Sequence, residues 1–288
     1  MRKFILIAAF IWLPGAASAG EPSSNVQRML AGFSAATGQL GLLDSLPSSA
    51  PPPAAVPKPV AYGFKLVYGE AKTAQAKKWK KILQGSMTFD KNVKLLNARF
   101  ALPFELVIET SQCGEANAWY HSSERKITFC YEEIAAAARL LKARGKTKKD
   151  ADQLALGDAL HTFYHEVGHA LIDVFNLPTV GREEDAVDQF ATLTLLSFGE
   201  EGELAAEVAA MQFLQSHKEN GRLSFWDEHS FDKQRHYDTL CLIYGKDPDK
   251  RADMVGPRKL PEKRAERCPA EYEHLDAAWK SLLAPHQR

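Results

Sequence analysis

The spacing of apolar and polar residues changes period near the middle of the chain. Strand-like alternation occurs in YGFKLVYG (62–69), in FELVIET (104–110) and in both halves of NAWYHSSERKITFCY (117–131). The polar turn inside the last stretch predicts a hairpin. Between these runs, FDKNVKLLNARFAL (89–102) has a helical pattern that stops at Pro103. The pattern therefore predicts a small sheet in the first part of the folded region.

Helical spacing dominates from residue 131 onward. It is present in 131–145, which stops at Gly145, in 149–175, in 183–198 and in the segment that follows. After that segment, aromatic and charged residues are mixed without a clear period. A small sheet followed by a mostly helical C-terminal part is an α+β fold.

The first 19 residues have the layout of a secretory signal peptide. A basic start, MRK, precedes FILIAAFIWL (4–13), which is too short to span a bilayer, and ASA (17–19) places small residues before the cleavage point. Cleavage after Ala19 predicts a protein that is exported, to the periplasm or as a secreted protein, with no membrane span left. A retained N-terminal anchor is the alternative.

Composition divides the rest of the chain. Residues 20–60 are rich in Pro, Ala and Ser, which predicts a flexible linker, and residues 61–288 are expected to form one folded domain. The 36 basic and 36 acidic residues balance, so there is no support for a nucleic-acid partner. The sequence does not indicate an oligomeric state.

The chain has four cysteines, Cys113, Cys130, Cys241 and Cys268. An even number in an exported protein favours disulfides. Of the three possible pairings we expect Cys113–Cys130 and Cys241–Cys268, because each closes a short local loop. Metal ligation is the alternative, but no two of these cysteines have the two- to four-residue spacing of a zinc site.

The helix expected at 149–175 carries YHEVGH (164–169). His165 and His169 are four residues apart, so both imidazoles can face one Zn²⁺ ion. Glu166 lies one step round the helix, where it can act as general base on a metal-activated water. Gly168 is expected to leave room for the metal or substrate. The alternative is an ordinary polar stretch, but the neighbouring residues are apolar, and buried polar groups need partners.

A third metal ligand is expected at the start of the next helix, 183–198, because the loop before it can turn back. Glu184 and Asp188 share one face. Glu184 is the candidate ligand, and Asp188 is expected to accept a hydrogen bond from a ligand histidine. Glu183 and Asp185 are explained by charge compensation at the helix N-terminus, although either could replace Glu184 as ligand.

These motifs resemble a known family. HEVGH followed by EEDAVDQFA is similar to the gluzincin metallopeptidases. More closely, the chain resembles the DUF4344 family of exported bacterial metallopeptidases over about residues 105–280, in CGEANAWY, YHEVGHALIDVFNLPTVGREEDAVDQFA, DEHSFDKQRHYDTLCLIYG and RAERCPAEY. The resemblance implies a zincin-like fold and peptidase activity. It also implies that His165, His169 and Glu184 are zinc ligands and that Glu166 is the catalytic base.

Other residues could complete the site. In zincin-type folds the substrate lies along an edge strand, and ANAWY (116–120) is the candidate here, although its aromatic residues could equally serve hairpin packing. For the developing oxyanion, DEHSFDKQRHYD offers His229, Arg235, His236 and Tyr237, most of which are expected to be surface or structural residues. Of these, His229 and Tyr237 are the candidate hydrogen-bond donors. His161 is expected to support the ligands or to lie at the surface.

The leading hypothesis from sequence is an exported zinc metallopeptidase that acts on a peptide or protein substrate. The main alternative is a non-catalytic binding or sensor module with a structural metal. Glu166 separates the two hypotheses, because a structural metal site has no use for a glutamate beside its first ligand. Metal-dependent hydrolysis of a different bond is a third possibility.

Overall fold

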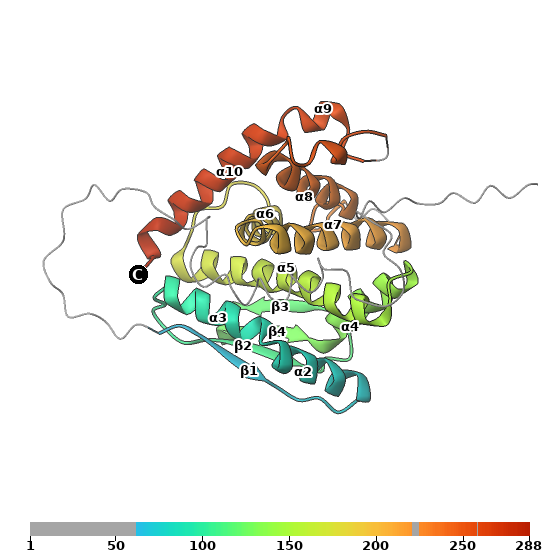
Figure 1. Ribbon diagram of the computed structural model, residues 1–288. Helices are drawn as coiled ribbons and strands as arrows, with labels where there is room; N and C mark the ends of the chain where they lie inside the picture. The colour runs from blue at the N-terminus through green and yellow to red at the C-terminus, as the bar shows by residue number, and fades with distance from the viewer. Residues whose placement is uncertain (1–61, 221–224, 258) are drawn as a thin grey trace, which may run out of the picture.

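The computed structural model describes residues 62–220, 225–257 and 259–288 (Figure 1). The signal peptide expected at 1–19 and the linker expected at 20–60 lie outside the described residues. The described part has a mixed α+β fold, as the sequence predicts. None of its helices is long and apolar enough to cross a membrane.

The described strands form one mixed sheet of order β1-β2-β4-β3. β1 pairs with β2 and β2 with β4 in parallel, whereas β3 and β4 form the antiparallel hairpin that the sequence predicts. Along β2, alternate side chains are buried, so one face of the sheet packs against the core. β3 is left at the edge of the sheet. The strands are β1 (Phe64–Tyr68), β2 (Leu106–Ser111), β3 (Ala118–His121) and β4 (Lys126–Cys130).

The helices expected near 89–102, 131–145, 149–175 and 183–198, and in the segment after them, are confirmed as α3 to α7. The sequence analysis did not predict α2, which lies before this set, or α8, α9 and α10, which follow it. The bounds are α2 (Ala74–Ser86), α3 (Thr88–Arg99), α4 (Tyr131–Ala143), α5 (Lys148–Phe175), α6 (Glu183–Leu196), α7 (Glu200–Asn220), α8 (Asp232–Lys246), α9 (Glu262–Ala265) and α10 (Cys268–Leu283).

Helix α5 runs through the centre of the molecule, between the sheet and the helices α6 and α7 (Figure 1). It begins after Thr147, whose side chain accepts a hydrogen bond from the Asp150 amide, and ends at Asn176 in the left-handed conformation. Most of its side chains are buried, including Phe163 and Tyr164. A helix that is apolar on nearly every side must be covered on every side, so its polar residues are held in fixed surroundings.

Gly168 has a different use from the one expected. A Cβ atom at this position would lie 2.9 Å from Cγ1 of Val187 and 3.2 Å from Cδ1 of Phe190. Both neighbours belong to α6, so the glycine lets α5 and α6 approach closely. The expectation that Gly168 leaves room for metal or substrate is therefore corrected: α6 fills that space, and the close approach brings the start of α6 to the histidines.

Two disulfides have the expected pairing. Cys113–Cys130 joins the loop after β2 to the end of β4, and Cys241–Cys268 joins α8 to α10. No described cysteine is free. Both bridges favour an oxidising environment outside the cytoplasm.

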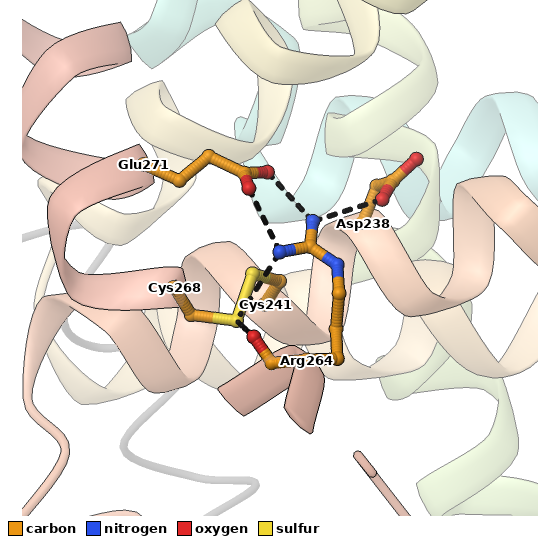
Figure 2. Close-up of a disulfide and its surroundings, with 5 residues drawn as sticks. All are labelled: Asp238, Cys241, Arg264, Cys268 and Glu271. Atoms are coloured by element: carbon orange, nitrogen blue, oxygen red, sulfur yellow. Dashed lines mark hydrogen bonds and ion pairs between the residues drawn. A yellow bond between two sulfur atoms is a disulfide. The ribbon is translucent and has the colours of Figure 1, made fainter. Parts of the chain in front are cut away.

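The second bridge lies in a small cluster of its own (Figure 2). Arg264 donates hydrogen bonds to both carboxylate oxygens of Glu271, at 2.7 and 2.6 Å, and to Asp238 at 3.1 Å. Asp238 belongs to α8 and Glu271 to α10, so the ion pairs join the same two helices as the disulfide. Together they fix α8, the helix that carries Arg235.

Candidate metal centre

Three predicted ligands converge between α5 and α6. One ligand atom from each of His165, His169 and Glu184 lies within 4.8 Å of the other two. Nε2 of His165 is 3.1 Å from Oε2 of Glu184, and Nε2 of His169 is 3.4 Å from Oε1 of the same carboxylate. The geometry that the spacing predicts for the two histidines is present, and Glu184 is the acid that faces both.

The opposite ring nitrogens of the two histidines are held by carboxylates. Nδ1 of His165 lies 2.8 Å from Oδ1 of Asp188, as expected, and Nδ1 of His169 lies 2.7 Å from Oε1 of Glu183. Hydrogen bonds at Nδ1 leave Nε2 of both rings directed at Glu184. Glu183 therefore does more than compensate charge at the N-terminus of α6: it orients His169.

Asp188 has a second partner, Arg235, which comes from α8. Nε of Arg235 donates to Oδ2 of Asp188 at 2.6 Å, and a terminal guanidinium nitrogen donates to Oδ1 at 2.9 Å. Burial would raise the pKa of the Asp188 carboxyl, but Arg235 and His165 together hold that pKa well below its usual range. Arg235 is thus part of the centre rather than a surface residue, and it keeps Asp188 ionised.

The electrostatics of the centre favour a positive charge between the carboxylates. Burial lowers the pKa of His165, but its hydrogen bonds to Asp188 and Glu184 outweigh burial and raise the pKa to about 9. Burial would raise the pKa of Glu184, but the surrounding imidazoles hold it far below its usual range. A bound cation would satisfy the same carboxylates while leaving both histidines neutral.

The residues present fit a zinc ion. Oε2 of Glu184 is buried, and the groups close to it are imidazole nitrogens, with Nε2 of His165 at 3.1 Å and Nε2 of His229 at 2.9 Å. Two imidazole nitrogens and one carboxylate oxygen are a frequent donor set for catalytic zinc, with a further position left for water. A metal at this point would bind Glu184, His165 and His169 in place of these contacts.

Glu166 lines the same cavity. Its side chain is buried, and burial raises the pKa of its carboxyl. A backbone hydrogen bond from Tyr120, on β3, opposes that rise. The edge strand and the predicted base are therefore in contact, so a chain lying along β3 would pass Glu166.

His229 reaches the centre from the loop before α8. Its Nε2 lies 2.9 Å from Oε2 of Glu184, and its Nδ1 lies 3.2 Å from Oδ1 of Asp227. The hydrogen bond to Glu184 raises the pKa of His229. The structure thus places His229 at the cleft, as the sequence analysis expected.

Tyr237, the other candidate donor, is not among the described residues that line the cavity. It packs instead against the cluster that contains Cys241, Leu260 and Cys268. Tyr237 is two positions after Arg235 on α8, so its side chain leaves the helix on a different face from the one that points at Asp188. The structure therefore does not bring Tyr237 to the metal centre.

The cavity around these residues has a volume of about 1240 Å³. Its walls come from β3, from the helices α4 to α8, and from the loops before α6 and α8. Residues 117–120 line it, so most of the ANAWY stretch is at the cleft, where the Tyr120 hydroxyl donates to Asp173 at 2.6 Å. His161 also lines the cavity but is 3 % exposed, with Nε2 3.2 Å from the Thr192 hydroxyl. Burial lowers the pKa of His161 to about 4, so it is neutral.

Sequence reasoning missed two further acids at one end of this cavity, Glu133 on α4 and Asp158 on α5. The position of Asp158, seven residues before His165, is a signal that could have been used, because residues two helical turns apart share a face. Nothing in the sequence near Glu133 distinguishes it from the other acids in the first turn of α4.

Comparison with known proteins agrees with the geometry. A family model described as "Putative metallopeptidase", DUF4344, matches residues 68–283. Neither the curated proteins nor the solved structures compared with the chain gave a match. The matched segment contains β2 to α10, and with them every residue of the metal centre. The chain belongs to the DUF4344 family.

Proposed function

We propose that this protein is an exported zinc-dependent peptidase with a zincin-like fold. The observation that carries the proposal is the position of Glu166. It lines the cavity beside His165 and His169, while Glu184 completes a donor set suited to zinc. A purely structural metal would need the three ligands but not a buried carboxylate next to them.

The cleft offers a place for an extended peptide. β3 pairs with β4 on one side, and no described strand pairs with its other side. Residues of β3 line the cavity, so we propose that the substrate backbone adds to this edge as a further strand. This mode of binding would hold the scissile carbonyl near His165 and Glu166 through the substrate backbone.

When bound, zinc would lower the pKa of the attacking water and polarise the scissile carbonyl. In this proposal Glu166 accepts the proton of that water as it attacks and passes it to the departing amide nitrogen. The raised pKa of Glu166 suits both transfers, because a base that must later act as an acid works best when its pKa is near the working pH.

His229 is the proposed donor to the oxygen that gains negative charge. Asp227 accepts a hydrogen bond from Nδ1 of His229. The raised pKa of His229 favours the protonated ring, so Nε2 of His229 can donate a hydrogen bond. In the structure, Nε2 of His229 contacts Glu184. In this proposal His229 leaves Glu184 and donates to the substrate oxygen instead. Asp188 and Arg235 keep His165 oriented during the reaction.

We also propose that the protein is exported by the signal peptide expected at 1–19. The two disulfides support an oxidising location, and a periplasmic or secreted enzyme would meet peptide substrates there. N-terminal sequencing of the protein recovered from the periplasm or medium should find Gly20 at or near the start. An intact Met1 would overturn this part of the proposal.

The test of the function combines metal analysis with an assay on a mixture of unlabelled peptides, read by mass spectrometry. Wild-type protein should hold about one zinc per chain and produce new peptide termini, and a chelator should stop cleavage. Glu166→Gln should keep the zinc and lose the cleavage. Glu273→Gln is a matched control on the exposed side of α10 and should behave as wild type. Cleavage by Glu166→Gln at the wild-type rate would overturn the assignment.

A further inference from the structure

The cavity continues past Glu166 to an end that the proposed mechanism does not use. Glu133, in the first turn of α4, and Asp158, on α5 two turns before His165, both line this end. Glu133 is close enough to Glu166 and to Asp158 for the negative charges to interact. The three carboxyls therefore form a row that leads away from the metal centre.

These two acids lack the partners that buried carboxylates usually have. Asp158 is 5 % exposed, and its one described hydrogen bond is a long contact of 3.4 Å from Nε2 of Gln212. No hydrogen bond or ion pair joins Glu133 to any residue that the structure describes. Oε1 of Gln212 is also buried without a partner. Asp158 and Oε1 of Gln212 are thus buried acceptors with one long contact from a donor, which is costly unless a ligand supplies another donor, and the half-buried Glu133 adds a further acceptor to the same cavity.

The cations that line the cavity are engaged elsewhere. Among the described lining residues, the arginines are Arg182 and Arg235. Arg235 is paired with Asp188 through two hydrogen bonds, and Arg182 donates to the backbone carbonyl of His229 at 2.7 Å. His161, the nearest imidazole along α5, is neutral because it is buried. None of the described residues that line the cavity therefore offers a positive charge to Glu133 and Asp158.

The same cavity has an aromatic wall. Phe213, one residue after Gln212 on α7, lines the cavity; its ring packs edge-on against His161 with centroids 5.6 Å apart, and the guanidinium of Arg235 lies over it at 4.0 Å from the ring centroid. A long aliphatic side chain with a charged end could lie along this ring while its end reaches the acids. Lysine and arginine are the two amino acids with that shape and charge.

We propose that Glu133 and Asp158 form a subsite that binds a lysine or arginine side chain of the substrate, close to the bond that is cleaved. The two carboxylates pair with the cationic group, Oε1 of Gln212 accepts a further hydrogen bond, and the methylene stem packs on Phe213. This inference rests on the proposed peptidase function and adds a substrate class to it: peptides with a basic residue beside the scissile bond.

The first experiment measures selectivity on pairs of peptides that differ only in lysine or norleucine at one position, scanned across the cleavage site. Norleucine keeps most of the aliphatic stem and removes the charge. At one position the lysine peptide should have a kcat/KM about 100-fold higher, because norleucine would leave the buried Asp158 and the half-buried Glu133 unpaired. Equal rates for lysine and norleucine at every position would overturn the subsite and leave the peptidase function standing.

Variants then locate the preference. Glu133→Gln combined with Asp158→Asn should bring the lysine peptide down to the rate of the norleucine peptide, while the norleucine peptide changes little. Asp152→Asn is the matched control, because Asp152 is on α5 but outside the cavity, paired with Lys78 and Lys148. It should keep the full preference for lysine. A double variant that still prefers lysine about 100-fold would overturn the assignment to these residues.

A binding measurement separates failure of the subsite from failure of the proposed function. In the Glu166→Gln background, the lysine peptide should bind at least about 10-fold more tightly than the norleucine peptide, and the two added substitutions should remove the difference. If wild type cleaves no peptide but this difference is found, the subsite stands and the peptidase function falls. Thermal melting of each variant checks that it is folded; neutral amides in place of unpaired acids should not lower the melting temperature.

Discussion

The two ends of the cleft use carboxylates in opposite ways. At the metal centre, Asp188 is shared by His165 and Arg235, and Glu183 is paired with His169. At the other end, Glu133 and Asp158 have no cation among the described residues. Paired carboxylates fix the direction of the groups they bind, whereas unpaired ones leave a charge to be met by something from outside. The paired carboxylates hold the metal centre in a constant geometry. The unpaired Glu133 and Asp158 are suited to select the substrate side chain.

Both ends lie on one helix, so α5 itself does not explain the difference. The neighbours of α5 do. Around His165, α6 brings its first-turn acids and α8 brings Arg235, so charges of both signs are present. Around Asp158, α4 brings Glu133 and α7 brings Gln212, and neither supplies a cation. The contrast therefore depends on which helices pack on each half of α5.

The largest expected effect is loss of turnover in Glu166→Gln. Removal of the general base should lower kcat by about 10²–10⁴-fold without loss of zinc, because the amide cannot accept the proton of the attacking water. Glu133→Gln changes the acid next to Glu166 in the cavity and should leave kcat on a norleucine peptide nearly unchanged. Steady-state kinetics on both variants would test whether Glu166 serves catalysis and Glu133 serves substrate selection. Equal losses in kcat would show that the two residues do not have separate roles.

Metal affinity should separate Glu184 from its neighbour. Glu184→Ala removes a donor to the metal and should weaken zinc binding by at least about 100-fold. Glu183→Ala removes only the hydrogen bond to His169 and should weaken it by about 10–100-fold. Competition with a chromophoric chelator measures both affinities. If Glu184→Ala holds zinc as wild type does while Glu183→Ala releases it, the third ligand is Glu183.

The parts predicted from sequence are those that depend on local spacing. The pair His165 and His169, the base between them and the hairpin at 117–131 all follow from periodicity over a few residues. α8 and α10 were missed because their segments mix aromatic and charged residues, and helical spacing is obscured when few positions are fully buried, as in α10 with Cys268, Trp279 and Leu283.

Contacts between distant segments could not be predicted from the sequence. Arg235 is 47 positions from Asp188, and no local pattern distinguishes it from other arginines. The same holds for Glu133, which meets Asp158 only because α4 packs on α5. Glu183 was explained by the charge of the helix N-terminus, a reason that holds for most first-turn acids and so hid its hydrogen bond to His169.

A smaller effect on zinc binding and activity is expected from Asp188 and Arg235 at the metal centre. Asp188→Asn should weaken zinc binding or lower kcat/KM by about 10–100-fold, because an amide orients His165 less firmly and removes the carboxylate that pairs directly with Arg235. Arg235→Gln in the same protein should recover part of the stability lost by Asp188→Asn, because it removes the charge that has lost its direct partner. Urea unfolding of the two single variants and the double variant measures this coupling. Strictly additive losses would mean that the pair does not act as one unit.

The smallest effect is a gain of stability at the other end, in Asp158→Asn. Burial raises the pKa of Asp158 from 3.8 to about 7, and the charge of Glu133 on α4 adds to the rise, while Gln212 on α7 and neutral His161 bring no compensating charge. Below pH 3.8 the carboxyl is protonated in both the folded and the unfolded chain, so it costs nothing. As pH rises toward 7, the unfolded chain loses this proton while the folded chain keeps it, and stability falls. Above that pH the cost is constant.

The variant removes this titration, so its advantage over wild type should be small at pH 5 and reach about 1–2 kcal/mol at pH 8, after allowance for water in the cleft. Urea unfolding of zinc-free protein at both pH values measures the difference. Asp152→Asn, which loses only ion pairs outside the cavity, should show a difference that does not grow with pH. If Asp158→Asn is less stable than wild type at pH 8, Asp158 has a counter-charge in the folded protein. The two ends of the cleft would then be paired alike, and the reason for a basic substrate side chain at Glu133 and Asp158 would disappear.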